Sequence, residues 1–310
     1  MEMGMVGLGR MGGNMVLRLL KRGHRMVAFD QSPDAVKSHV SQGAVGANSL
    51  EDFVKAFESR PRVMWVMVPA GEPTTQSINK LVELGDSGDI IIDGGNTNWK
   101  IALQDAARVK AKGMHYMDAG TSGGIWGLEY GYCLMVGAEQ DIYDHCLPLL
   151  KDLAPDDGGL VRTGAEGSGH FVKMVHNGVE YGLMQAYAEG FQVMKLSRSF
   201  PGMNMQAIAE AWRTGSVVRS WLLDLIARGL TQDPELSSIK GWVEDTGEGR
   251  WTVEAAIDES VPVPIIAESL FARFRSRMEN TFGDRLLAMM RNQFGGHAVV
   301  SDAKAEAARK

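Results

Sequence analysis

The stretch "MGMVGLGRMGGNM", residues 3–15, decides the fold. Its apolar opening is typical of a buried strand, and Gly7, Gly9 and Gly12 follow in the pattern G-x-G-x-x-G before a helical pattern begins. In this context the first glycine permits a tight turn, the second lets a pyrophosphate approach the backbone, and the third allows the helix to pack on the sheet. Free N–H groups at the helix start attract the anion. The motif predicts a dinucleotide site, with a plain glycine turn as the alternative.

An acidic residue stands at the end of the second apolar run, "RMVAF". Asp30 follows Gly7 by 23 residues, where a carboxylate accepts hydrogen bonds from the ribose hydroxyls of a dinucleotide. A carboxylate repels a 2′-phosphate, so we expect NAD rather than NADP, although Arg10 would still tolerate NADP. The alternative role of Asp30 is to cap the turn before Ser32. The other residues expected to contact the cofactor are Leu8, Arg10, Met11, Val68 and Asn96.

Outward from the motif, short apolar runs alternate with amphipathic stretches. Further strands are expected over 62–69, 89–95 and 115–120, and helices over 12–24 and 99–113. This alternation predicts an α/β fold, a Rossmann-like, doubly wound parallel sheet with helices on both faces, in a domain spanning residues 1–164.

Pro, Gly and Asp cluster in "LAPDDGGLVRTGAEGSG", residues 153–169, and the chain then becomes helical in pattern. A long helix is expected over 167–195, followed by helices over 203–213, 216–229, 252–258 and 264–292. The sequence therefore predicts an all-α domain over residues 165–310.

Composition excludes several classes of protein. The 310 residues are 45% hydrophobic and 23% charged with a net charge of −6, which is ordinary for a globular protein and argues against nucleic acid as a partner. Cys133 and Cys146 match neither a metal-ligand spacing nor a disulfide framework. No leader peptide or membrane-spanning run is evident. We expect a cytoplasmic protein that uses no metal and contacts no membrane.

Four polar side chains share one face of the long helix. Lys173, His176, Asn177 and Glu180 fall within an arc of about 100° at helical spacing. Lys173 is a solvated cation, an ion-pair partner or a catalytic base. Asn177 lowers helix propensity immediately before a glycine, which favours a site over a purely stabilising role. His176 lacks the partners of a metal ligand.

A second candidate is the segment "DAGTSGGIWGLEYG", residues 118–131. Ser122 is followed by Gly123 and Gly124, and a hydroxyl beside two glycines exposes backbone N–H groups that suit a carboxylate or hydroxyl of a small substrate. A flexible connection is the alternative.

Together these motifs resemble the β-hydroxyacid dehydrogenase family and, within it, the 6-phosphogluconate dehydrogenases. The resemblance covers nearly the whole chain. It rests on "GLGRMGGNM" at 7–15, "DGGN" at 93–96, "SGG" at 122–124, "GHFVKMVHNGVEYG" at 169–182, "GEGRWT" at 247–252 and "RNQFGGH" at 291–297. It implies an oxidoreductase of the pentose phosphate pathway that oxidises and decarboxylates 6-phosphogluconate.

The resemblance also implies roles for single residues. Lys173 would be the base at the C3 hydroxyl and Glu180 the acid that protonates the product carbon, with Asn96 between nicotinamide and substrate. The residues implied to hold the carboxylate and hydroxyls are Ser122, Gly123, Gly124, His176 and Asn177. Those implied to hold the phosphate or sugar are Tyr181, Arg273, Arg291 and His297. The last two come from a neighbouring subunit in the family, which implies a homodimer or homotetramer.

The chain departs from the family pattern at one position of the phosphate site. Thr246 stands where many members have a phosphate-binding lysine, and the chain resembles the short form of the family. Two alternatives therefore stay open: another 3-hydroxy acid or sugar-acid dehydrogenase of the same family, and a non-catalytic dinucleotide-binding protein.

Overall fold

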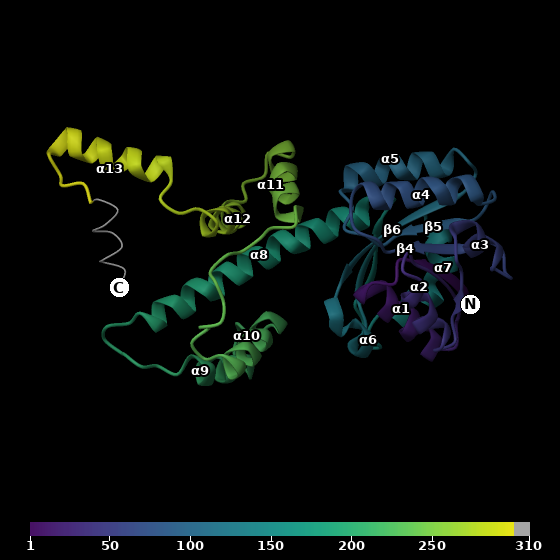
Figure 1. The fold of residues 1–310 in the computed structure, drawn as a ribbon, viewed down its shortest axis with the longest axis horizontal. Coiled ribbons are helices and arrows are strands. Elements are labelled where there is room, and N and C mark those ends of the chain that lie inside the picture. The colour runs from purple at the N-terminus through teal and green to yellow at the C-terminus, as the bar shows by residue number, and fades with distance from the viewer. Residues whose placement is uncertain (301–310) are drawn as a thin grey trace. The chain divides into compact units, whose positions relative to one another are not determined.

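A computed structural model describes residues 1–300 (Figure 1). The strands are β1 (Glu2–Val6), β2 (Arg25–Phe29), β3 (Val45–Gly46), β4 (Val63–Val66), β5 (Ile90–Asp93), β6 (His115–Ser122), β7 (Cys133–Gly137) and β8 (Leu160–Gly164). The helices that accompany them are α1 (Arg10–Lys21), α2 (Pro33–Val40), α3 (Leu50–Lys55), α4 (Glu72–Leu84), α5 (Trp99–Lys110), the 3₁₀ turn η1 (Gly124–Trp126), α6 (Gly127–Tyr130) and α7 (Gln140–Leu153). The later helices are α8 (Ser168–Lys195), α9 (Met205–Arg213), α10 (Trp221–Gln232), α11 (Glu248–Asp258), α12 (Pro264–Ser276) and α13 (Phe282–Gly295).

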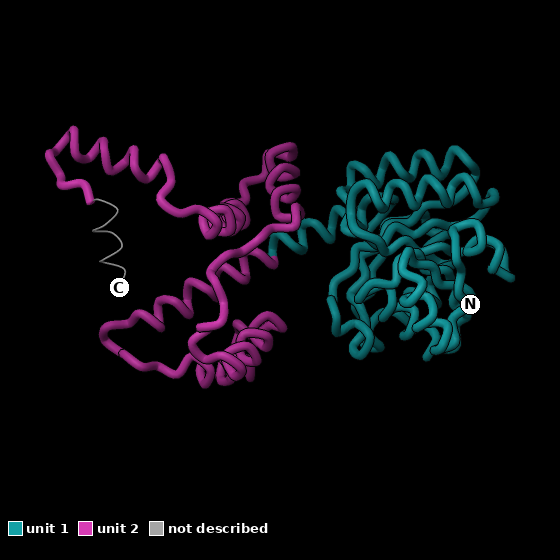
Figure 2. Tube along the Cα trace, in the orientation of Figure 1, with its two compact units in different colours: residues 1–179 teal, residues 180–310 magenta. Residues whose placement is uncertain are grey.

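The chain forms two compact units, Met1–Val179 and Glu180–Lys310 (Figure 2). The first unit contains all eight strands and the beginning of α8. The second consists of the remainder of α8 and the helices that follow it. The strip of polar residues predicted on α8 therefore extends across the division.

The sheet has the order β3-β2-β1-β4-β5-β6-β7-β8. Every neighbouring pair is parallel except β6 and β7, so the expected α/β fold is confirmed with one antiparallel exception. Gly123 and Gly124, both at positive φ, lie at the reversal between these two strands. The direction of winding changes between β1 and β4, and such a switch point opens a crevice at the carboxyl ends of the strands.

Two hydrophobic clusters explain the continuous apolar runs of the strands. In β4, Val63 and Trp65 belong to one cluster while Met64 and Val66 belong to the other, because successive strand residues face opposite sides of the sheet. Residues of α1 and α7 fill the first cluster, and residues of α3, α4 and α5 fill the second. The sheet is thus covered on both faces (Figure 1).

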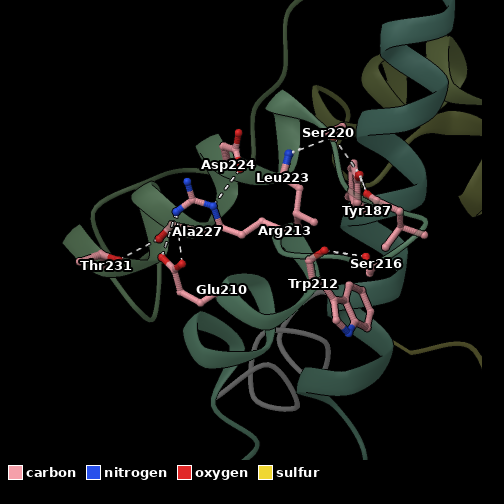
Figure 3. A network of polar contacts seen from close by, with 11 residues as sticks. Tyr187, Glu210, Trp212, Arg213, Ser216, Ser220, Leu223, Asp224, Ala227 and Thr231 are labelled. Carbon is pink, nitrogen blue, oxygen red and sulfur yellow. Dashed lines mark hydrogen bonds and ion pairs between the residues drawn. The ribbon is translucent and has the colours of Figure 1, made fainter.

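The second unit has its own small core, where α9 and α10 pack together with residues of α8. Phe191 of α8 and Trp212 of α9 meet edge to face at 5.7 Å between ring centroids. Around this core, Tyr187 Oη lies 2.9 Å from Ser220 Oγ and Arg213 Nε donates to Asp224 Oδ1 at 2.8 Å (Figure 3). The contacts of Phe191 and Tyr187 join α8 to the following helical pair, and the Arg213–Asp224 contact joins α9 to α10.

The helix expected over 264–292 is wrong as a single element, because α12 ends at Ser276 and α13 begins at Phe282. Asn280 has φ +48°, a left-handed conformation that a continuous helix does not contain. Thr281 then caps α13, its hydroxyl accepting from Asp284 N at 3.2 Å. The cap separates two helices that the apolar spacing alone had joined.

Two other helix starts also differ from expectation. The helix expected from 216 begins at Trp221, where Ser220 Oγ accepts from Leu223 N at 3.1 Å. The helix expected from 252 begins earlier, at Glu248, directly after Gly247 at φ +106°. In both cases a local cap or a glycine sets the boundary rather than apolar periodicity.

Candidate active site

The glycine loop between β1 and α1 has the conformation that the motif predicts. Gly7 has φ +99°, and a Cβ added there would lie 2.3 Å from Met67 O. A Cβ on Gly12 would lie 2.1 Å from Gly7 O. Gly9, in contrast, has φ −63° and no atom within 4 Å of an added Cβ. The fold itself requires the first and third glycines, whereas the second leaves open space for a ligand.

A cavity of about 660 Å³ opens beside this loop, at the switch point of the sheet. Its volume falls within the range of ligand sites. It is lined by Val6, Gly7, Gly9, Phe29, Asp30, Gln31, Leu50, Met67, Val68, Pro69, Glu72, Pro73, Gln76, Ser77 and Lys80. The residues present fit a dinucleotide, because the loop offers backbone N–H groups at a helix start and Asp30 offers a carboxylate.

Asp30 lines the cavity and also orders the loops around it. Its Oδ2 accepts from Leu8 N at 2.7 Å and its Oδ1 from Ser32 N at 2.8 Å. Ser32 in turn caps α2. The two roles considered for Asp30 are therefore compatible, since one carboxylate holds the turn and faces the cavity.

The other expected cofactor residues lie in different environments. Val68 lines the cavity, Leu8 is buried beneath the loop, Met11 packs against the core and Arg10 is exposed at the start of α1. The motif does not predict the cavity residues of α4, which are Glu72, Pro73, Gln76, Ser77 and Lys80. A sequence signal exists for them, because "GEP" at 71–73 is typical of a helix start directly after a buried strand.

Lys173 lies where α8 packs closely against β6. It is only 8% exposed. A Cβ added to Gly120 of β6 would lie 2.4 Å from Lys173 Cβ and 2.8 Å from Gly169 O. The absence of a side chain at Gly120 therefore allows this helix, and the lysine on it, to contact the sheet.

The predicted polar strip forms direct contacts on α8. Lys173 Nζ donates to Asn177 Oδ1 and lies 3.5 Å from His176 Nδ1. His176 Nδ1 lies 3.1 Å from Asn177 Oδ1. Glu180, the fourth member of the strip, is half-buried and is the first residue of the second unit. Three of the four side chains that helix spacing places on one face therefore contact one another in the first unit.

The remaining candidates of the first unit follow β5 and β6. Asn96 is exposed in the loop after β5. Ser122 ends β6, two residues after Gly120, and pairs in register with Cys133. Gly123, at φ +133°, and Gly124, at φ +53°, adopt conformations that favour glycine. Ser122 thus ends the strand that contacts Lys173, and Gly123 and Gly124 directly follow it.

The second unit brings together Tyr181, Arg273 and Thr246. Tyr181 is 5% exposed, and the Arg273 guanidinium lies 3.5 Å from the centroid of its ring. Thr246 N donates to Tyr181 Oη at 3.3 Å, and the Thr246 hydroxyl donates to Glu248 Oε2. Glu248 is buried, and among residues 1–300 its Oε1 has no hydrogen-bond partner.

Beside this group, two arginines form ion pairs with one carboxylate. Asp245 accepts from Arg250 at 2.5 Å and from Arg277 at 2.8 Å. The hydrogen bond from Arg250 is the main reason why the pKa of Asp245 is lowered. Arg291 and His297, the other predicted phosphate residues, are exposed on and just after α13. None of the residues of α13 is buried.

Within the part of the chain that the structure describes, no three His, Cys, Asp or Glu side chains are arranged to hold a metal ion. Over residues 1–300, no helix has both the length and the apolar character needed to cross a bilayer.

The fold and the cavity define a dinucleotide-binding protein with a helical second part. Comparison with known proteins then identifies the family. The model described as the NAD binding domain of 6-phosphogluconate dehydrogenase matches residues 2–164, and the model described as the C-terminal domain of 6-phosphogluconate dehydrogenase matches residues 169–307. The chain belongs to the 6-phosphogluconate dehydrogenase family.

Individual relatives agree with this assignment. The chain is 41% identical over 96% of its length to a putative 6-phosphogluconate dehydrogenase of Bacillus subtilis, covering 99% of that protein. It is equally identical, over 96% of its length and 98% of the relative, to the NAD(+)-dependent, decarboxylating 6-phosphogluconate dehydrogenase of Haloferax volcanii. The solved structure of Plasmodium falciparum 6-phosphogluconate dehydrogenase matches 97% of the chain with a TM-score of 0.82 at 25% identity, and the match covers 66% of that longer protein.

Proposed function

We propose that this protein catalyses the NAD-dependent oxidative decarboxylation of 6-phospho-D-gluconate to D-ribulose 5-phosphate and carbon dioxide. The burial of Lys173 carries the proposal. Its amine contacts Asn177 on a helix packed against the dinucleotide-binding sheet. Proteins use buried lysines as general bases, because the pKa of a lysine responds readily to burial. Full-length similarity to a relative named as an NAD(+)-dependent, decarboxylating enzyme supports the same reaction.

In the proposed reaction, bound NAD supplies the acceptor for the hydride that leaves C3. Lys173 removes the proton from the C3 hydroxyl as C3 becomes a carbonyl. The bond between C1 and C2 then breaks, and its electron pair forms an enediol as carbon dioxide leaves. Lys173 returns its proton to the C3 oxygen. Glu180 donates a proton to the carbon that becomes C1 of the product, and Lys173 takes the proton back from the C3 oxygen as the carbonyl is restored.

The other expected residues hold the substrate in this scheme. Backbone N–H groups around Gly123 and Gly124, with the side chains of Ser122, His176 and Asn177, bind the carboxylate and hydroxyls, and Asn96 lies between substrate and nicotinamide. Tyr181 and Arg273 hold the distal phosphate, for which a guanidinium provides matching donors. Asp30 in the cavity favours NAD over NADP.

Two substitutions test the roles of the ionisable residues. We expect Lys173→Met to abolish hydride transfer while NADH binding persists, as measured by stopped-flow absorbance and by fluorescence titration. Glu180→Gln is expected to slow proton exchange at C1 of ribulose 5-phosphate, measured by NMR in deuterated water. Appreciable turnover by Lys173→Met, or unchanged exchange in Glu180→Gln, contradicts the respective role. Absence of NADH production by the wild type with any hydroxy acid would favour the non-catalytic alternative.

The functional unit in this proposal is a homo-oligomer in which Arg291 and His297 complete a neighbouring site. The exposed apolar side chains of α13 support a contact between this helix and a partner chain, because clusters of exposed apolar side chains mark protein interfaces. They are Phe282, Leu286, Leu287, Met289, Met290 and Phe294, the last 94% exposed.

Subunit mixing tests this arrangement directly. Lys173→Met and Arg291→Ala proteins are each expected to be nearly inactive. If the tail acts in the neighbouring site, random reassortment into dimers restores about a quarter of the sites. If the tail acts within its own chain, mixing restores nothing. Light scattering of the wild type gives the subunit number.

A second candidate function is oxidation of an unphosphorylated sugar acid or another 3-hydroxy acid. Thr246 and the buried Glu248 favour it, because they place a hydroxyl and a carboxylate beside Tyr181, where the resemblance predicts a phosphate. A carboxylate repels a phosphate and accepts hydrogen bonds from hydroxyls. Comparison of kcat/KM for 6-phosphogluconate, gluconate and 3-hydroxyisobutyrate separates the two candidates, and Thr246→Lys is expected to improve use of the phosphorylated substrate.

A further inference from the structure

A buried cluster of ionisable groups, Asp93, His170 and Asp118, lies beneath the candidate site and is not used by the scheme above. Each residue is at most 3% exposed. Asp93 ends β5, and its partner in the strand register is Asp118 of β6. Two buried carboxylates in neighbouring strands repel each other and lose hydration, so a protein retains them only with compensating partners.

The beginning of α8 supplies the partners of Asp118. Gly167 N donates to Asp118 Oδ1 at 2.6 Å, and His170 N donates to Oδ2 at 2.7 Å. The first N–H groups of a helix have no partner within the helix, so this carboxylate caps α8 from the sheet. Burial raises the pKa of Asp118, although His170 and both N–H groups act in the opposite direction.

The side chain of His170 compensates Asp93. His170 Nε2 lies 3.3 Å from Asp93 Oδ2. Asp93 also accepts from Gly95 N at 3.0 Å and from Tyr116 Oη at 3.1 Å. Burial alone would raise the pKa of Asp93 and lower that of His170. Burial is the largest single effect on each group, but the attraction between them, together with hydrogen bonds to Asp93 and the charge of Asp118 near His170, outweighs it, so the pKa of Asp93 is lowered and that of His170 is raised. At 3.3 Å the two side chains are within ion-pair distance, without the geometry of a hydrogen bond at Nε2.

This ion pair connects the two segments that carry the proposed chemistry. Asp93 begins the loop that contains Asn96, and its bond to Gly95 N shapes that loop. His170 lies one helical turn before Lys173 on α8. We propose that Asp93 and His170 are positioning residues, whose contact sets Lys173 on α8 against the Asn96 loop and so holds the base at the correct distance from the reacting carbon. This inference rests on the role proposed for Lys173.

A second contact between the same segments makes the proposal testable. Trp99, at the start of α5, meets Phe171 of α8 edge to face at 5.6 Å between ring centroids. Loss of the ion pair therefore leaves α8 attached to the sheet but less precisely placed. A misplacement of about 1 Å costs on the order of a hundredfold in rate.

A matched control exists at the opposite end of β5. Asp89 directly precedes this strand, is fully buried and forms an ion pair with the buried Arg62. Asp89→Asn disturbs the same sheet, because it replaces a buried carboxylate that accepts from Arg62 N at 2.9 Å and from Arg62 Nη1 at 2.5 Å, while Asp86 remains paired with Arg62 at 3.0 Å. It does so at the edge away from Asp93, the loop and α8. Asp89→Asn therefore reports the effect of lost stability alone.

The experiment compares His170→Gln, Asp93→Asn, the double variant and Asp89→Asn. We expect the first three to lower kcat by about 10- to 100-fold with the Kd for NADH and the KM changed by less than about twofold. Substrate deuterated at C3 should show a larger primary isotope effect, because hydride transfer becomes more fully rate-limiting. Asp89→Asn should unfold at lower urea concentration but keep the wild-type kcat per folded molecule.

The proposal is overturned if the His170 and Asp93 variants lose no more kcat per folded molecule than Asp89→Asn, or if the isotope effect stays unchanged while affinity for NADH falls. The double variant contains no unpaired charge in this pair, so it provides the test if a single variant does not fold. If the wild type acts on a different hydroxy acid, the proposed substrate is wrong. The same kcat ratios, measured with that acid, still decide whether the two residues position Lys173.

Discussion

The substitution Gly9→Ala should weaken binding of the cofactor while leaving the stability of the fold nearly unchanged. The backbone at Gly9, with φ −63° and ψ −172°, is one that alanine adopts readily. An added Cβ meets no atom within 4 Å. The free energy of unfolding should therefore change by no more than about 0.5 kcal/mol.

Binding of NAD should respond very differently. The methyl group would occupy the space through which a pyrophosphate approaches the N–H groups at the start of α1. Loss of one hydrogen bond to a charged oxygen costs about 1.5–3 kcal/mol. Since about 1.4 kcal/mol corresponds to a tenfold change, the Kd for NADH should rise by roughly one to two orders of magnitude.

Calorimetric titration with NADH and urea unfolding measure the two effects separately. Gly12→Ala is the control, because its Cβ would lie 2.1 Å from Gly7 O. Overpacking of this kind costs about 1–3 kcal/mol, so this variant should lose both stability and binding. Wild-type affinity in Gly9→Ala, or unfolding as early as in Gly12→Ala, would refute the reasoning.

Three further predictions follow from single groups. Asp30→Ser should lower the ratio of kcat/KM for NAD to kcat/KM for NADP by about tenfold or more. An unchanged ratio would exclude a contact between Asp30 and the ribose of the cofactor. The pKa of His170 is raised, because interactions that include the attraction to Asp93 exceed the effect of burial. His170 should therefore contribute its full stabilisation of the fold below the ordinary pKa of 6.5, and this stabilisation should be lost as pH rises through the folded pKa. Because the pKa of Asp93 is lowered, Asp93 should stabilise the fold above its ordinary pKa of 3.8, and this stability should be lost as pH falls through the folded pKa. Urea midpoints measured across pH should show both slopes. Both slopes should be weaker in the double variant Asp93→Asn/His170→Gln, in which Asp118 and Tyr116 still lie beside the two substituted positions. Gly190→Ala, inside α8 with no atom near its added Cβ, should stabilise the protein by about 0.5–1 kcal/mol in urea unfolding, and a loss of stability would show a packing role.

Local features of the chain were predictable because their causes are local. The glycine spacing after the first strand, the alternation of apolar runs with helical stretches, and the contact of Lys173 with Asn177 all depend on residues a few positions apart. The same local reasoning failed where a cap overrides periodicity, as at Thr281, whose hydroxyl interrupts an otherwise continuous apolar pattern. Helix boundaries set by single residues are poorly indicated by patterns averaged over many.

By itself, then, the sequence determined that a dinucleotide-binding α/β domain precedes a helical one, and that a lysine, an imidazole and an amide share a helix face. Only the tertiary structure decided that Gly9 is free of the protein's own atoms, that Gly120 admits Lys173, and that β7 runs antiparallel to β6. The tertiary structure also places Asp93 opposite Asp118 in the strand register, with His170 beside Asp93. Strand register and the approach of a helix to a sheet join residues distant in the chain, so no local pattern encodes them.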